Sequence, residues 1–449
     1  MKKSLILILC GLLLGVVAAV AVTQYVIPRW QRSAVDNTYW QVASRLDQGG
    51  EAFVYLHAEQ FTQAVQAVLA SVKKNVAALP EAQQAQASQG LVMAEMMFKG
   101  YGLEEVSGLG YSSFALRPGL HRVRAVLHHR PGRNKGLIWN ITGPAPRALD
   151  EMALFPAGTA LAFVSDYDIV KLIEWMGQIA PQMAGQEGQD PAMKPGMAPI
   201  KAGLQSVGID ADRLFKSYGG RLGFLLTLDP EKRVALPLGA KPVSIPEPAF
   251  ALLVRVQDSY IFDTLKDKLA AMGQTKSTED GGVKKLAFPR LPAPFPLEPV
   301  IAQKGEWLLA ASRLSLVDDV LAPRSPRLSQ SDEFRAISYK LPLRGNGFSF
   351  MSPLLPRLVS QALRENLVNF PAPAALERIT AFLDNCKGFC QVWENTDQGL
   401  VYTIHHGLEI SSLPGLIDAF IEIGRQQTTR QPEPVPSPPQ AEEGQQTAE

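Results

Sequence analysis

Two cysteines near the carboxyl end of the chain have the spacing that points most directly to chemistry. Cys386 and Cys390 are four residues apart in Asn385–Gln391, and Gly388 lies between them. In an oxidising compartment such a pair can close a small loop, so we predict a disulfide. A thiol-exchange centre is an alternative, although such centres ordinarily have two residues between the cysteines and a thiol of lowered pKa.

The same two thiols offer a second alternative, which is a zinc site. If the strand that carries Cys390 pairs with Leu400–His406, then His405 and His406 come near the sulfur atoms. Two thiolates and one or two imidazoles suit tetrahedral zinc. Adjacent residues of a strand point to opposite faces, so His405 is the imidazole that we would add to Cys386 and Cys390. Our main interpretation has no metal and no cofactor.

A basic strand forms another candidate site. Alternation over Leu120–His128 places Arg122, Arg124 and His128 on one face, and Arg130 follows in the turn. Guanidinium groups bind the phosphate or carboxylate groups of lipids, glycans or peptides. The alternative is a solvated outer face of a sheet. The stacked aromatic side chains of a nucleic-acid platform are missing, and we expect no nucleic-acid partner.

Signatures of common enzymes are absent from the sequence. The chain has no Gly-x-Ser-x-Gly, His-Glu-x-x-His, phosphate-loop or Gly-x-Gly-x-x-Gly motif. Asp166 with Asp168, and Asp318 with Asp319, are pairs that a glycosidase could use. Helix caps and solvated helix turns explain both pairs more simply. A cell-envelope hydrolase with an unrecognised active site is therefore our alternative to a binding protein.

An apolar segment at the amino terminus indicates a membrane. Lys2 and Lys3 precede the uncharged stretch Ser4–Pro28, which is long enough to cross a hydrocarbon core of about 30 Å. The same arrangement describes a cleavable export signal, for which Ala19–Ala21 offers a cleavage pattern. We favour an uncleaved signal anchor over residues 1–32. The lysines would stay inside, which puts the rest of the chain on the extracytoplasmic side, in the periplasm or at the cell surface.

Composition indicates a folded body without a strong electrostatic field. Of 449 residues, 46% are hydrophobic, and 44 basic against 43 acidic side chains leave a formal net charge of +1. This balance gives no global attraction for nucleic acid. Residues 426–449 differ, because they are rich in Pro, Gln and Glu, and we expect a disordered tail there.

Four segments share one pattern, a short apolar strand that changes abruptly to helical spacing. They begin at Gly50, Gly158, Phe250 and Gly345. Short connections between the strands that follow favour antiparallel sheets. We therefore predict an α+β fold, in which repeated units of antiparallel sheet carry amphipathic helices. The expected divisions are residues 33–150, residues 151–245, and residues 246–425 with the third and fourth units.

Local spacing predicts how these units are built. The first helix has an apolar stripe that indicates one buried face, made of Phe61, Val65, Val68, Leu69, Val72 and Val76. At the start of the second helix, the Ser165 hydroxyl is expected to cap a free amide, while the acids Asp166 and Asp168 lie at the positive end of the helix. The segment Gly136–Thr142 is predicted to be a strand, and the proline-rich residues 232–248 are predicted to be a connection.

The residues at the ends of the strands and helices in these units resemble those of one group of exported proteins. The matching segments are Phe155–Ala160 with Asp166, Gly208–Asp210, Tyr218–Gly220 and Trp307–Arg313. The layout is similar to that of bacterial exported proteins built on a domain of unknown function with repeated strand–helix units. The resemblance covers roughly residues 150–410 and implies location and architecture, but no activity.

These observations lead to one expectation for function. We expect a membrane-anchored extracytoplasmic protein that acts by binding or scaffolding. One-sided helices packed on antiparallel strands can leave an apolar groove, and a lipid or a peptide would fit such a groove. The expected partners are the membrane, through the amino-terminal helix, and a lipid, a peptide or another protein of the envelope.

Overall fold

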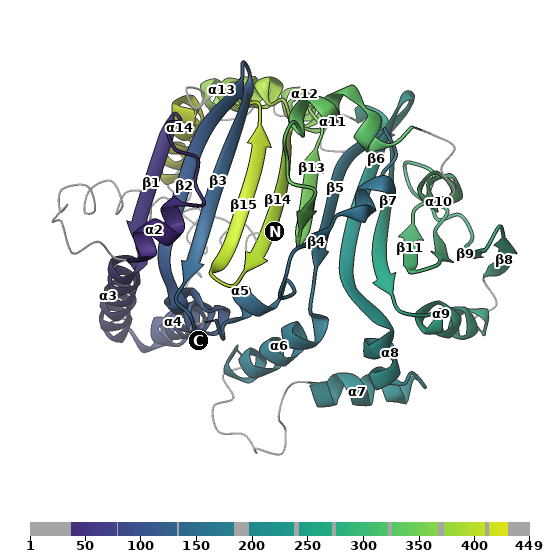
Figure 1. Ribbon diagram of the computed structural model, residues 1–449, viewed down its shortest axis with the longest axis horizontal. Coiled ribbons are helices and arrows are strands. Elements are labelled where there is room, and N and C mark those ends of the chain that lie inside the picture. The colour runs from purple at the N-terminus through teal and green to yellow at the C-terminus, as the bar shows by residue number, and fades with distance from the viewer. Residues whose placement is uncertain are drawn as a thin grey trace, which may run out of the picture.

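A large antiparallel sheet runs through the computed structural model (Figure 1). The structure describes residues 37–78, 80–132, 134–183, 197–237, 242–271, 275–321, 326–366, 372–408 and 413–429. The anchor predicted for residues 1–32 lies outside these ranges, as does the predicted tail from residue 430 onward. Among the described helices, none combines the length and the apolar character that a membrane span needs.

The strands of the sheet come from the whole described length of the chain. They are β1 (Ala52–His57), β2 (Val106–Arg117), β3 (Leu120–His129), β5 (Thr159–Asp166), β6 (Tyr218–Leu236), β7 (Val243–Val256), β8 (Lys276–Asp280), β9 (Val283–Ala287), β10 (Val300–Lys304), β11 (Trp307–Ala311), β13 (Gly347–Met351), β14 (Phe389–Thr396) and β15 (Gly399–His406). Their order is β1-β2-β3-β15-β14-β13-β5-β6-β7-β11-β10-β9-β8. Every neighbouring pair is antiparallel. The short strands β4 (Arg147–Ala148) and β12 (Arg344–Gly345) pair separately. A mixed fold of helices with a large antiparallel sheet, as the sequence predicted, is confirmed.

The four strand–helix starts predicted from the sequence are each a strand followed directly by a helix. β1 leads into α3 (Ala58–Ala77), β5 into α6 (Ile169–Met183), β7 into α9 (Tyr260–Ala270) and β13 into α12 (Leu354–Asn366). In three of these units a hairpin then pairs beside the first strand, giving the adjacent sets β1-β2-β3, β5-β6-β7 and β13-β14-β15. The set from the end of the chain lies between the other two, so the units share one sheet.

One face of this sheet is covered, and we call it the covered face. Its central side chains, such as Ala162, Leu225 and Leu253, are fully buried in the largest apolar cluster. The helices α10 (Leu314–Leu321) and α11 (Asp332–Ile337) pack on this face. Near β1–β3 it is covered by α2 (Asn37–Ala43), whose Val42 contributes to a smaller apolar cluster with Val126 of β3.

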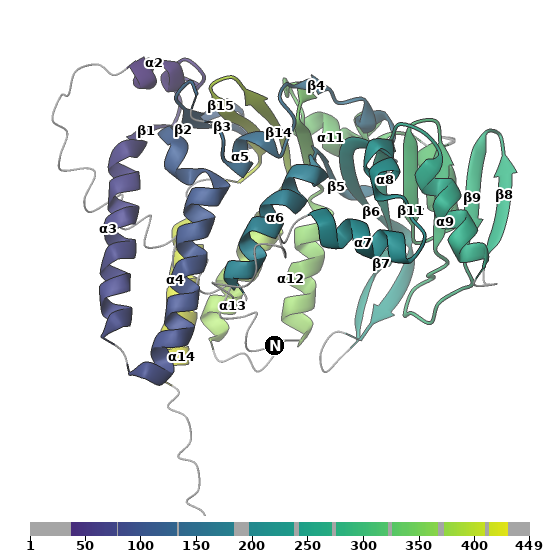
Figure 2. The same cartoon turned by 90° about the horizontal axis from the view of Figure 1, so that it is seen from below.

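Helices flank the opposite face at both ends of the strands, and we call it the helix-flanked face (Figures 1 and 2). Along one end lie α3, α4 (Glu81–Tyr101), α5 (Leu137–Asn140), α6, α7 (Met197–Ser206), α8 (Ala211–Ser217) and α9. Along the other end lie α12, α13 (Pro373–Asn385) and α14 (Leu413–Thr429). Figure 2 shows α3, α4, α6 and α12 extending away from the sheet. On this face α9 covers β9 and β11, through Phe262 packed with Leu286 and Leu308.

The expected burial of the first helix along one face is wrong for its middle part. Val68 and Val72 of α3 are both exposed. The helix packs on α4, β2 and β1 and otherwise extends away from the sheet (Figure 2), which is why a one-sided apolar stripe does not ensure burial along its whole length. The apolar periodicity predicted the helix but could not predict how far the sheet reaches.

Two local predictions are wrong for physical reasons that the structure shows. Residues 137–140 form the helix α5 instead of a strand, because the Glu105 carboxylate accepts from the amides of Lys135 and Gly136 at 3.0 and 2.8 Å and turns the chain. Residues 232–248 are mostly strand instead of a connection. Pro246 and Pro248 are tolerated there because β11 pairs with β7 only over Ala251–Arg255, so their side of β7 lacks a neighbour within the described sheet.

Candidate functional site

Cys386 and Cys390 are both buried free thiols in the structure. Cys386 follows the last turn of α13, and Cys390 lies in β14 between Phe350 of β13 and His405 of β15. Burial raises the pKa of the Cys390 thiol, which disfavours the thiolate that exchange chemistry or a metal would need. The disulfide predicted from the spacing stays a prediction.

The structure places His405 directly across from Cys390, as the pairing of the two strands predicted. The His405 Nδ1 donates a hydrogen bond to the Ile337 carbonyl at 3.0 Å, while its Nε2 is buried without a hydrogen-bond partner. Burial lowers the pKa of this imidazole and keeps the ring neutral. His406 points to the other face and stacks on His121. No group of three metal-binding side chains gathers within the described part of the chain.

The basic side chains of β3 lie on the covered face instead of on a solvated one. Arg122 pairs with Asp47 through two hydrogen bonds, of 2.7 Å from Nε and 2.6 Å from an amino nitrogen. His128 is fully buried, and its Nδ1 lies 2.7 Å from the hydroxyl of Ser107. Arg124 is half-buried, and so is Arg130 after the strand. The ion pair with Asp47 occupies the guanidinium of Arg122 that an anion would need.

A buried charged cluster, which the sequence analysis missed, lies where β5 and β6 meet at one end. Arg221 is fully buried and bonds to Asp166 at 2.8 Å and to Glu151 at 2.5 Å. Asp166 also accepts from Arg147 and, at 3.3 Å, from Asn346. Two carboxylates therefore face two guanidinium groups, so the cluster is balanced in charge and closed to a substrate.

The helix-start roles expected of Ser165 and Asp166 are thus wrong, because the Ser165 hydroxyl donates to the Asp166 carbonyl at 2.8 Å and the Asp166 carboxylate belongs to this cluster. Asp168 alone accepts at the start of α6, from the amide of Lys171 at 3.0 Å. Asp318, of the other acidic pair, bonds to Lys285 at 2.7 Å. Burial, and after it the Asp166 carboxylate, raise the pKa of the Tyr218 phenol. Asp166, Asp168 and Asp318 therefore each bond to a different partner within the fold.

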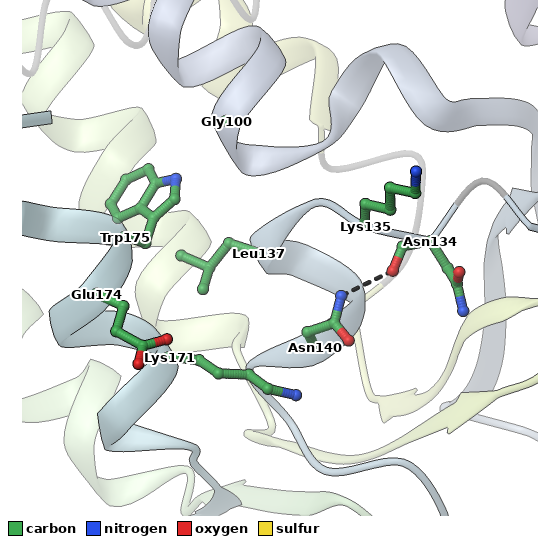
Figure 3. Close-up of a pocket in the computed structure, with 8 residues that line it drawn as sticks. All are labelled: Gly100, Asn134, Lys135, Leu137, Asn140, Lys171, Glu174 and Trp175. Carbon is green, nitrogen blue, oxygen red and sulfur yellow. Dashed lines mark hydrogen bonds between the residues drawn. The ribbon is translucent and has the colours of Figure 1, made fainter. Parts of the chain in front are cut away.

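A polar cavity of about 460 Å³ lies between α4, α5 and α6 (Figure 3). Its lining consists of Gly100, Asn134, Lys135, Leu137, Asn140, Lys171, Glu174 and Trp175. The Asn140 amide donates to the Asn134 carbonyl at 2.7 Å. Among the described lining residues Glu174 is the single carboxylate, and none of them places a nucleophile beside a base. The described lining side chains can donate and accept hydrogen bonds, but they do not form a catalytic arrangement.

Apolar side chains occupy both faces of β5, β6 and β7, although the described residues cover the helix-flanked face only in part, through α12. In the covered row Ala162, Leu225 and Ala251 pair across the strands and are fully buried. On the helix-flanked face, Phe163 pairs with Phe224 and Phe224 pairs with Leu252. Phe163 is 42% exposed and Leu252 is 53% exposed. Antiparallel strands with one solvated face ordinarily alternate apolar and polar residues, and these strands do not.

The neighbouring register row on the same face is apolar as well. Leu161 pairs with Leu226, which pairs with Phe250, and all three are half-buried. We call the members of the two rows the apolar patch, which comprises Leu161, Phe163, Phe224, Leu226, Phe250 and Leu252. The helices beside it also expose apolar side chains, among them Met176 of α6 and Val359 of α12. Contiguous apolar surface of this kind marks an interaction site more often than a random surface feature.

Aromatic rings lie beside the polar cavity and, separately, beside the apolar patch. Trp175 in the cavity lies edge-on to Tyr101 of α4, with ring centroids 6.2 Å apart. Next to the patch, Trp393 of β14 stacks on Phe163 at 5.6 Å between centroids, and Tyr402 of β15 is its cross-strand partner. The cavity and the apolar patch are therefore two separate candidate sites.

Comparison with known proteins identifies no relative. No family model matches the chain, and neither a curated protein nor a solved structure does. Function is therefore inferred from the geometry of the chain itself.

Proposed function

We propose that the protein binds the long hydrocarbon chain of a lipid at the apolar patch. The observation that carries this proposal is the apolar helix-flanked face of β5–β7, which the described residues cover only in part and on which Phe163 and Leu252 are exposed. Water-exposed apolar area of this kind gains free energy when a ligand covers it. A surface that served only solubility would carry polar side chains in these rows.

The contacts that the patch offers favour a hydrocarbon over an extended peptide. Around the patch, β5 pairs with β13 and β6, and β7 pairs with β6 and, over Ala251–Arg255, with β11, so the strands offer no backbone there to an added strand. The six side chains of the patch are Phe and Leu and cannot form hydrogen bonds. A ligand must therefore be held by apolar burial.

The length of the hydrocarbon follows from the free energy that each methylene group contributes. Burial of one methylene contributes about 0.8 kcal/mol, so about ten methylenes contribute roughly 8 kcal/mol. Association itself costs at least about 4 kcal/mol. The gain grows with the length of the chain while the cost of association does not, which favours a long acyl chain, and the acyl chain of a membrane lipid is the ligand that we propose.

The location that we propose follows from the amino-terminal sequence. The uncharged stretch Ser4–Pro28 behind Lys2 and Lys3 supports a signal anchor, with the body of the chain on the extracytoplasmic side of the membrane. A lipid-binding face tethered in this way would work next to the source of its ligand, as a holding or scaffolding protein.

Titration of the full-length protein with a pyrene-labelled dodecanoate tests the binding proposal. Leu252→Asp introduces a charge at the most exposed position of the patch and should weaken binding at least tenfold. Leu343→Asp is the matched control, because Leu343 is 70% exposed and lies outside the patch. The control should bind like the unaltered protein. Equal affinity of the Leu252→Asp variant and the unaltered protein would overturn the proposal.

A further inference from the structure

The polar cavity between α4, α5 and α6 has the size of a small-molecule site. Its volume of about 460 Å³ lies within the range of ligand pockets, which is about 300–1,000 Å³. The lining comes from the end of α4, from residues 134–140 and from α6 (Figure 3). Trp175 and Leu137 supply apolar surface, and the remaining described side chains of the lining are polar or charged.

Hydrogen bonds fix the part of the lining that precedes and forms α5. The Glu105 carboxylate holds the backbone amides of Lys135 and Gly136 at 3.0 and 2.8 Å. The side-chain amide of Asn140 donates to the carbonyls of Asn134 and Gly136, at 2.7 and 2.9 Å. Both hydrogens of this amide are therefore used, and its Oδ1 remains as an acceptor. The cavity thus presents an acceptor whose position is set before a ligand arrives.

Two ammonium groups and one carboxylate of the lining are available to a ligand. Among the described residues Lys135 and Glu174 have no ion-pair partner, and Lys171 has only Asp168, with 3.7 Å between Nζ and Oδ2. The Lys171 side chain is 48% exposed. An exposed pair at this distance contributes little, so Lys171 can exchange Asp168 for a ligand. The two lysines favour a ligand with an anionic group.

We propose that this cavity binds a small anion that also carries hydroxyl groups, of the phosphoglycerol type. The ammonium groups of Lys135 and Lys171 donate charge-assisted hydrogen bonds to the phosphate oxygens. The Glu174 carboxylate and the Asn140 Oδ1 can only accept, so they bind the hydroxyl groups of the ligand. An anion without hydroxyl groups leaves these acceptors unpaired. The cavity is separate from the apolar patch, and this inference does not depend on lipid binding there.

Isothermal titration calorimetry of the detergent-solubilised full-length protein with sn-glycerol 3-phosphate tests the need for the two lysines. The double variant Lys135→Met with Lys171→Met should weaken binding at least tenfold. The matched control is Lys216→Met with Lys276→Met, because both of these lysines are exposed and lie outside the cavity. Circular dichroism checks that the variants are folded. An absence of binding to the unaltered protein, or an equal loss in the two double variants, would overturn the proposal.

Methyl phosphate tests the need for hydroxyl groups, because its carbon carries none. The unaltered protein should bind methyl phosphate at least fivefold more weakly than glycerol 3-phosphate. Glu174→Ala should reduce this ratio, since it removes one of the two acceptors. Equal affinity of the unaltered protein for the two phosphates would contradict the proposal. Leu252→Asp should leave both affinities unchanged, so a failure here is distinguishable from a failure of lipid binding at the apolar patch.

Short-chain lipids distinguish the two sources of a phosphoglycerol group, which are a lipid headgroup and a free metabolite. If the cavity takes a headgroup, dihexanoyl phosphatidylglycerol should bind more tightly than dihexanoyl phosphatidylcholine. The double variant Lys135→Met with Lys171→Met should remove that difference. If the ligand is a free metabolite, glycerol 3-phosphate should bind while the two lipids show equal affinity.

Discussion

Trp393 lies across Gly347 on the helix-flanked face, in a position that only a glycine permits. A Cβ added at residue 347 would overlap the indole ring. The ring is buried and stacks on Phe163, with 5.6 Å between centroids. The absence of a side chain at Gly347 therefore allows the indole to lie close to the strand, where it stacks on Phe163 of the apolar patch.

Gly347→Ala should displace the indole and disturb the patch. Overpacking of a close contact costs about 1–3 kcal/mol, which urea unfolding would measure as a lower free energy of unfolding. The same variant should bind the pyrene-labelled dodecanoate more weakly, since Phe163 loses its stacking partner. Gly90→Ala serves as the control, because a Cβ at Gly90 meets nothing within 4 Å. Unchanged stability and binding in Gly347→Ala would show that the contact has no such role.

Arg221 should be the most costly arginine to remove. Arg221→Met leaves Asp166 and Glu151 buried without the guanidinium that bonds to both, and breaking a buried pair costs about 3–5 kcal/mol. The matched control is Arg255→Met, whose ion pair with Glu306 is partly exposed and should cost less than about 1 kcal/mol. Denaturant unfolding of the two variants compares these costs, and similar losses would contradict the role of the cluster.

Burial of His405 and His406 should make the unaltered protein less stable in mild acid. Burial lowers the pKa of both imidazoles, so below about pH 6.5 the unfolded chain takes up protons that the folded chain refuses. The free energy of unfolding should therefore fall between pH 7.5 and pH 5.5. Asp258 and Asp263 also have lowered pKa values, but their contribution is lost only at more acidic pH. His406→Gln should reduce the slope, and an unchanged slope would assign the effect to other groups.

Alkylation in denaturant without a reductant shows whether Cys386 and Cys390 are joined by a disulfide or are free thiols. If the exported protein carries the predicted disulfide, mass spectrometry should find Cys386 and Cys390 unalkylated and joined. After reduction both should react. Alkylation of both residues before reduction would mean that the buried free thiols of the structure are the native state.

The local units of this fold could be predicted from the sequence because their signals are local. The switch from apolar alternation to helical spacing at Gly158 and Gly345 marks β5–α6 and β13–α12. The hairpin of β14 and β15 was likewise predicted, and its register brings His405 beside Cys390. Strand pairing within a short hairpin is fixed by the turn and the apolar pattern.

The order of the units and the charged cluster could not be predicted in this way. β3 pairs with β15 through contacts such as Val126 with Val401, and local periodicity has no information about pairing across such a separation. Arg221 bonds to Glu151, which is 70 residues away in the sequence, and such a contact leaves no local signal. The sequence around Asp166 therefore indicated only the start of a helix. The sequence does carry a signal for the apolar patch. The strand sequence Thr159–Asp166 has apolar residues on both faces, which predicts that both faces are covered, either by the chain itself or by a ligand.

Photocrosslinking tests the lipid-binding face most directly. The full-length protein would be irradiated with a long-chain fatty acid that carries a diazirine, and the labelled peptides would be mapped by mass spectrometry. We predict labelling in β5–β7, around Phe163, Phe224 and Leu252, that an excess of unlabelled fatty acid removes. Labelling confined to residues outside the patch, or labelling that competition leaves unchanged, would contradict the account.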